Sequence, residues 1–209
     1  MLVLGDAHAD VDTRRTALLE VYEAVEPSVT IQVGDLLYYD LPSPTWFIAG
    51  NNEDYDVIDA LRAGESPPGT ANVTLVDSDV VELEGLRVGG LSGNFAPTRF
   101  EKRRSDLVGD RRRHFVKAEV DRAKALEAVD VFLSHEAPHG LLKANGYDPG
   151  CVHIDDILRA VEPDLCLVGH HHEHAEGSFG PTRVVALEPV WEAYYDLDPE
   201  TLELVRHPR

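Results

Sequence analysis

The chain has 209 residues and a formal net charge of -19, from 38 acidic and 19 basic residues. A chain of this length can bury a substantial core, and we expect a single domain over residues 1–209. No apolar run is long enough to cross a membrane. The N-terminal MLVLGD has neither the charged leader nor the long apolar segment of a signal peptide, so we expect a cytoplasmic protein. The acidic balance argues against a protein that binds nucleic acid over its whole surface.

Short apolar runs alternate with segments of helical spacing along most of the chain. Leu18, Val21, Tyr22 and Val25, for example, recur at i, i+3, i+4 and i+7. The apolar runs predict strands at 1–4, 29–33, 45–49, 72–76, 80–84, 86–91, 129–134, 164–168, 183–187, 192–197 and 202–205, and the helical spacing predicts helices at 11–25, 53–62, about 112–127, and 153–161. Repeated strand–helix units indicate an α/β fold with helices outside the sheets.

Polar residues of metal-ligand type follow five of the predicted strands. They are Gly5-Asp6-Ala7-His8, Gly34-Asp35, Gly50-Asn51-Asn52-Glu53, His135 and Gly169-His170-His171-His172. The carboxyl edge of an α/β sheet is where ligands bind, and a preceding glycine allows a sharp turn. An ordinary solvated loop explains any one of these segments. Five of them in one chain indicate a shared site.

The ordered motifs GDAH, GD, GNNE, SH and GHHH resemble those of the calcineurin-like metallophosphoesterase family. The family pattern is GDxH, then GD, then GN followed by His and an acid, then a lone His, then GHxH. The resemblance spans residues 5 to 172. It implies a four-layer α/β/β/α sandwich of two mixed sheets flanked by helices, with a pair of divalent metals at the strand ends.

The resemblance also implies which residues bind the two ions. The first metal would be held by Asp6, His8 and His172, the second by Asn51, His135 and His170, and Asp35 would bridge both. Imidazoles and carboxylates suit manganese, which we expect, or iron, zinc or nickel. A hydroxide between the metals would attack phosphorus in line, without a covalent enzyme intermediate.

The motif set departs from the family pattern at Asn52, where the usual residue is a histidine thought to protonate the leaving oxygen or stabilise the transition state. Asparagine carries no proton at neutral pH, although its amide can donate a hydrogen bond. Asn52 and Asp35 are therefore the catalytic candidates. Because some small phosphodiesterases of the family also lack this histidine, the change favours diesters over monoesters. Glu53, with no imidazole to orient, is expected to begin the next helix.

Residues 99–117 contain eight Lys/Arg and three Asp/Glu, a net +5 in an acidic chain. Such a segment either meets the phosphates of RNA or DNA or pairs with acids elsewhere on the surface. The flanking stretches 87–95 and 132–140 are loosely similar to segments of RNA lariat-debranching enzymes, although the GDAH motif is not the form usual there. The candidates for substrate contact are Asn94, His139, Arg99 and Arg103.

Three functional classes follow. The first is a metal-dependent phosphodiesterase or nuclease that acts on a nucleotide or nucleic acid. The second is a phosphomonoesterase of small metabolites, and the third is a non-catalytic metal-binding scaffold. The full ligand set argues against the third class, and Asn52 favours the first over the second.

Lysine supplies only 4 of the 19 basic residues. An acidic surface poor in lysine suits a protein that stays soluble in concentrated salt, so we predict a halophilic source. The fold should then be lost on transfer to low salt, as followed by circular dichroism. Full stability in dilute buffer would contradict this prediction.

Overall fold

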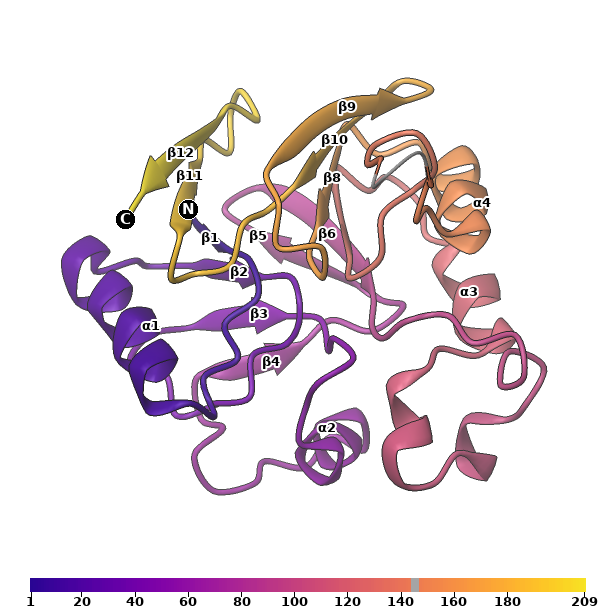
Figure 1. The fold of residues 1–209 in the computed structure, drawn as a ribbon, viewed down its shortest axis with the longest axis horizontal. Helices are drawn as coiled ribbons and strands as arrows, with labels where there is room; N and C mark the ends of the chain where they lie inside the picture. Colours follow the sequence, from indigo (N-terminus) through magenta and orange to yellow (C-terminus); the bar gives the residue numbers. More distant parts are fainter. Residues whose placement is uncertain (144–146) are drawn as a thin grey trace.

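Two six-stranded sheets face each other in the computed structural model, which describes residues 1–143 and 147–209 (Figure 1). The first sheet has the order β12-β11-β1-β2-β3-β4, with β1 (Leu2–Leu4), β2 (Thr30–Gln32), β3 (Thr45–Phe47), β4 (Val73–Leu75), β11 (Ala193–Leu197) and β12 (Leu204–Pro208). The second has the order β5-β6-β7-β8-β10-β9, with β5 (Val80–Leu83), β6 (Leu86–Leu91), β7 (Val131–Ser134), β8 (Leu165–Val168), β9 (Ala175–Phe179) and β10 (Thr182–Ala186).

Helices cover the outer face of each sheet (Figure 1). The first sheet packs against α1 (Asp12–Val25) and α2 (Tyr55–Arg62), and the second against α3 (Lys117–Ala123) and α4 (Val152–Val161). Two 3₁₀ helices, η1 (Arg104–Asp106) and η2 (Gly109–Arg113), precede α3. The four-layer α/β/β/α sandwich of two mixed sheets is therefore confirmed.

Three apolar clusters separate the four layers. The middle cluster joins the two sheets and includes Val3, Ile31, Leu133 and Leu167, all fully buried. The outer clusters lie under the two pairs of helices. Since successive residues of a strand face opposite sides, a strand buried on both faces reads as a continuous apolar run. That explains why the sequence shows MLVL and LCLV rather than an alternating pattern.

The parallel strands bring the five polar motifs to one edge. In the first sheet β1, β2 and β3 are parallel neighbours, and in the second β7 and β8 are parallel neighbours. Parallel strands end on the same side of a sheet, so the turns that follow them are adjacent. The candidate site is built from these turns, and it lies where the two sheets meet.

The structure differs from the sequence prediction at one expected helix and at one strand that was not expected. The helix expected at about 112–127 covers only Lys117–Ala123, because the backbone of 113–115 pairs with Asn94 instead (Asn94 N to Arg113 O, 3.0 Å; Phe115 N to Asn94 O, 3.1 Å). The strand β9, AEGSF, was not predicted because it lacks apolar alternation. Among the described residues it pairs only with β10, at the edge of the second sheet. No helix in the described ranges is both long and apolar enough to cross a membrane.

Candidate metal centre

Several candidate ligands sit in left-handed backbone conformations. The φ angles of His8, Asp35, His170 and His172 are 43°, 55°, 70° and 54°. Such conformations cost about 1–3 kcal/mol each for residues with a Cβ, and they persist only where the surrounding structure fixes them. The turns after β1, β2 and β8 therefore hold strain at the residues that the motifs single out.

Gly34 lets three of these turns approach one another. Its φ is +104°, and a Cβ at this position would meet Nδ1 of His135 and lie 2.9 Å from the Cα of Gly50. A residue with a side chain would push apart the turns that follow β2, β3 and β7. The glycine of this GD motif is thus required by close packing as well as by its backbone angle.

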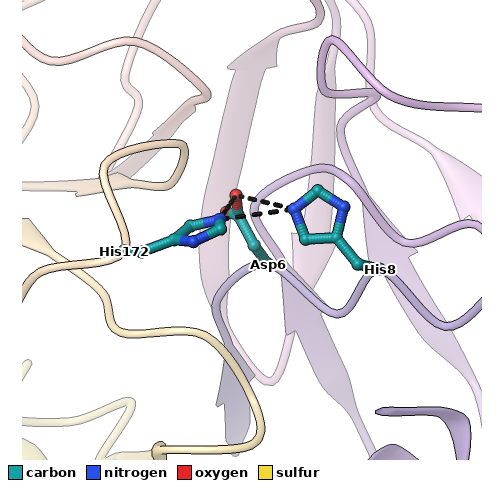
Figure 2. Close-up of side chains that lie close together, drawn as sticks. All are labelled: Asp6, His8 and His172. Carbon is teal, nitrogen blue, oxygen red and sulfur yellow. Dashed lines mark hydrogen bonds and ion pairs between the residues drawn. The ribbon is translucent and has the colours of Figure 1, made fainter. Parts of the chain in front are cut away.

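Asp6, His8 and His172 form the first cluster, with one ligand atom of each within 4.8 Å of the others (Figure 2). Nε2 of His172 lies 2.9 Å from Oδ2 of Asp6 and 3.3 Å from Nε2 of His8. Two ligands that are each about 2.0–2.2 Å from one ion are separated by roughly 3–3.6 Å. The spacing suits a cation between these side chains.

A second cluster, Asp6, Asp35 and His135, shares Asp6 with the first. One oxygen of Asp35 lies 3.5 Å from Nε2 of His135, and the other lies 3.4 Å from Nε2 of His8. Asp35 thus faces both histidines, as a bridging carboxylate would. Nε2 of His135 is also 3.1 Å from Oδ1 of Asn51.

His170 lies beside the second cluster without joining either group. Its backbone N–H donates to Oδ1 of Asp6 at 2.9 Å, and its ring centroid is 4.9 Å from that of His135. Burial and the charges of His135 and His171 lower the pKa of His170 to about 4. The imidazole is therefore neutral at pH 7, the form that a metal ligand requires.

A hydrogen bond on the side of the ring away from Asp35 fixes the orientation of His135. Its Nδ1 donates to the carbonyl of Val33 at 2.9 Å, because a carbonyl oxygen can only accept. This bond leaves Nε2 to face the side-chain oxygens of Asn51 and Asp35, and Nε2 can bind a metal once it has lost its proton. Holding the second nitrogen of a ligand imidazole in this way sets its tautomer and its angle.

Asn52 is engaged with the acid that faces both clusters. Its backbone N–H donates to Oδ1 of Asp35 at 2.6 Å, and its side-chain amide donates to Oδ2 at 2.8 Å. The residue that replaces the usual histidine therefore orients the Asp35 carboxylate.

Glu53 has a role that the sequence did not reveal. It does not begin α2, whose N-cap is Asp54. Its buried carboxylate accepts from the backbone N–H groups of Leu36 (3.0 Å) and Leu37 (3.1 Å) and from the hydroxyl of Tyr39 (2.7 Å). Burial raises the pKa of Glu53 to about 7, against the effect of these donors. Through these hydrogen bonds Glu53 connects its own turn, GNNE, to the turn that follows Asp35.

The four candidates for substrate contact are placed less uniformly. Asn94 follows Gly93, whose N–H donates to the carbonyl of Ala49 at 2.7 Å, so its loop adjoins the GNNE turn. His139 is held by Asp155, at 2.9 Å from Nδ1 to Oδ2, and lines a cavity beside the residue after His135. Arg99 and Arg103 lie on the basic segment, outside both clusters.

Comparison with known proteins gives the class of this site. Residues 1–174 match the family of calcineurin-like phosphoesterases. The chain belongs to this family, which depends on binuclear metal centres, and it is a hydrolase that acts on phosphoester bonds. No curated protein sequence matches the chain.

Solved structures share the fold at low sequence identity. The protein TT1561 of Thermus thermophilus is 15% identical, with a TM-score of 0.68 and coverage of 99% of this chain and 97% of that one. A dimetal phosphatase from Danio rerio is 14% identical, with a TM-score of 0.58 and coverage of 100% and 95%. GAP50 of Plasmodium, described as the anchor in the inner membrane complex, is 10% identical, with a TM-score of 0.55 and coverage of 99% and 87%.

Manganese affinity should rise as pH increases from 6 to 8. The hydrogen bond to Asp6 raises the pKa of His172; burial lowers that of His135, but the charges of Asp6 and Asp35 outweigh it and raise the pKa. Raised pKa values keep both imidazoles protonated above their usual pH range, so an ion must displace protons to bind. Calorimetric titration in two buffers of different ionisation enthalpy measures that release. Affinity independent of pH would contradict this assignment of ligands.

Proposed function

We propose that this metallophosphoesterase hydrolyses phosphodiesters of a nucleotide or nucleic acid, through two divalent metals held by the seven residues of the motifs. One observation favours diesters above all: position 52 holds a neutral amide that is bonded to Asp35. A monoester carries close to two negative charges at neutral pH, since its second pKa is about 6, whereas a diester carries one. Asn52 offers no positive charge to offset the additional one.

The protein's own groups would orient the reaction. Asp35 presents one oxygen toward His8 and the other toward His135, and the two bonds from Asn52 fix the plane of its carboxylate. Bound divalent ions would supply the activation of water and the neutralisation of phosphate charge. Manganese is the metal we propose, because mixed imidazole and carboxylate donors suit it.

The basic segment, residues 99–117, favours a substrate that carries more than one phosphate, such as a nucleic-acid polymer. Five of its eight cations form ion pairs with acids, namely Arg103, Arg104, Arg112, Arg113 and Lys117. The other three, Arg99, Lys102 and Arg111, form no ion pair within residues 1–143 and 147–209, and they line one cavity of about 390 Å³. Surface pairing therefore explains most of the segment. The three remaining cations are the ones we propose to meet phosphate.

A comparison of bis-p-nitrophenyl phosphate with p-nitrophenyl phosphate, in the presence of manganese, tests the proposed function. We expect faster turnover of the diester, followed by activity on RNA, DNA or cyclic nucleotides in a substrate panel. Faster turnover of the monoester would favour a phosphomonoesterase of small metabolites. If neither substrate were hydrolysed, the result would favour a non-catalytic metal-binding scaffold.

The kcat of the variant Asp35→Asn should fall more than about 100-fold. Loss of a residue that only orients a metal ligand typically costs about 10- to 100-fold, so a larger fall indicates a direct ligand. The amide can still accept one hydrogen bond, but it cannot bridge two cations as a carboxylate does. Metal content and circular dichroism should show fewer bound ions with the fold retained. Asp121→Asn, a change in an exposed acid on α3, is the matched control. Wild-type turnover by Asp35→Asn at saturating manganese would refute the two-metal assignment.

The variant Asn52→His should improve substrates with poor leaving groups most. Histidine supplies an acid with an unperturbed pKa of about 6.5, and general acid catalysis contributes roughly 10²–10⁴-fold where it operates. The gain should fade as pH rises above the histidine pKa. Rates are measured for a series of leaving groups on the wild type, on Asn52→His and on Asn52→Ala, which removes the amide without adding an acid. If the rates of the wild type and of Asn52→His depended equally on leaving-group pKa, position 52 would not assist departure of the leaving group.

A further inference from the structure

An arginine and a tryptophan stack at the rim of the metal centre. Cζ of Arg14, in the first turn of α1, lies 4.2 Å from the ring centroid of Trp191, in the turn between β10 and β11. Both side chains are half-buried. A guanidinium lying on an aromatic face keeps its N–H groups at the edges free to donate, while the stacking limits its motion.

The tryptophan in turn contacts two of the proposed metal ligands. Its ring centroid is 5.6 Å from that of His172, edge to face, and 6.0 Å from that of His8. The charge of Arg14 therefore lies one ring away from both imidazoles. Consistent with this closeness, burial lowers the pKa of His8 most, and Arg14 acts in the same direction.

Arg14 has no acidic partner within the described residues. The chain has 38 acids, yet within the described residues the Arg14 guanidinium makes no hydrogen bond and no ion pair. Its neighbour Arg15, by contrast, pairs with Asp12 and donates to the carbonyl of Ala9. A cation left without a partner beside buried acids is suited to an anionic ligand, and arginine donates to phosphate oxygens in a fixed planar geometry.

We propose that Arg14, positioned over the ring of Trp191, binds a non-bridging oxygen of the substrate phosphate beside the His8 and His172 side of the metal centre. Trp191 is then a positioning residue, because it acts through Arg14 and the two imidazoles. This inference rests on the proposed metal centre, but it does not depend on whether the substrate is a diester or a monoester.

The experiment uses the full chain loaded with manganese and inorganic phosphate as the ligand. Calorimetry gives the dissociation constant of phosphate, atomic emission gives the metal content, and hydrolysis of bis-p-nitrophenyl phosphate gives kcat and KM. Arg14→Ala should weaken phosphate binding by about 10- to 100-fold, as expected when a hydrogen bond to a charged group is lost. The metal content should stay at the wild-type level.

Three further variants sharpen the test. Arg14→Lys should recover part of the affinity, because it restores the charge without the planar fork. Trp191→Leu should weaken phosphate binding less than Arg14→Ala, since the cation remains but is no longer held. Arg15→Ala is the matched control on the same helix turn and should bind phosphate as the wild type does.

Two results would overturn the proposal. One is unchanged phosphate affinity in Arg14→Ala at full metal content. The other is loss of bound metal in Arg14→Ala, which would make the residue structural. A wild-type protein that binds phosphate but hydrolyses no diester would refute the proposed function alone, because the phosphate titration still decides the role of Arg14.

Discussion

The candidate metal centre depends on contacts between carboxylates of one sheet and imidazoles of the other. Asp6 and Asp35 follow β1 and β2 of the first sheet, whereas His135 and His172 follow β7 and β8 of the second. The contacts of Asp6 with His172 (2.9 Å) and of Asp35 with His135 (3.5 Å) cross the junction between the sheets. Any change in how the sheets pack would therefore separate the candidate ligands, so the apolar layer between the sheets sets the geometry of the site.

The buried charges explain why this junction should hold cations. Asp6 and Asp35 are each 1% exposed, and His135 is completely buried. Burying two carboxylates so close together is unfavourable unless positive charge balances them. Protonated His135 and His172 can supply part of that balance, which is why the nearby carboxylates raise their pKa values. Divalent ions would replace those protons and satisfy both acids at once.

Sequence patterns predicted those parts of the structure that are determined by residues close together in the chain. Apolar runs located the strands, and the motifs located the residues at their ends, because a strand end is defined within a few residues of chain. Glu53 could not be assigned in this way, since its partners Leu36, Leu37 and Tyr39 belong to another turn. Likewise, the start of α3 is set by pairing of 113–115 with Asn94, a contact that helical periodicity does not reveal.

Charge distribution gives the last constraint on function. A phosphoester approaching a chain of net charge -19 meets a repulsive field, and the centre itself contains buried acids. Several arginines are paired with acids, as Arg112 is with Asp56 and Asp59 of α2. Attraction would therefore come from bound metals and from cations without acidic partners. The described chain offers such charge in two places: at Arg14, on the rim of the centre, and in the cavity lined by Arg99, Lys102 and Arg111 of the basic segment.

In concentrated salt the long-range repulsion is screened, whereas a short-range contact between a fixed guanidinium and a phosphate oxygen persists. An acidic surface is then compatible with the proposed binding of phosphate at this centre.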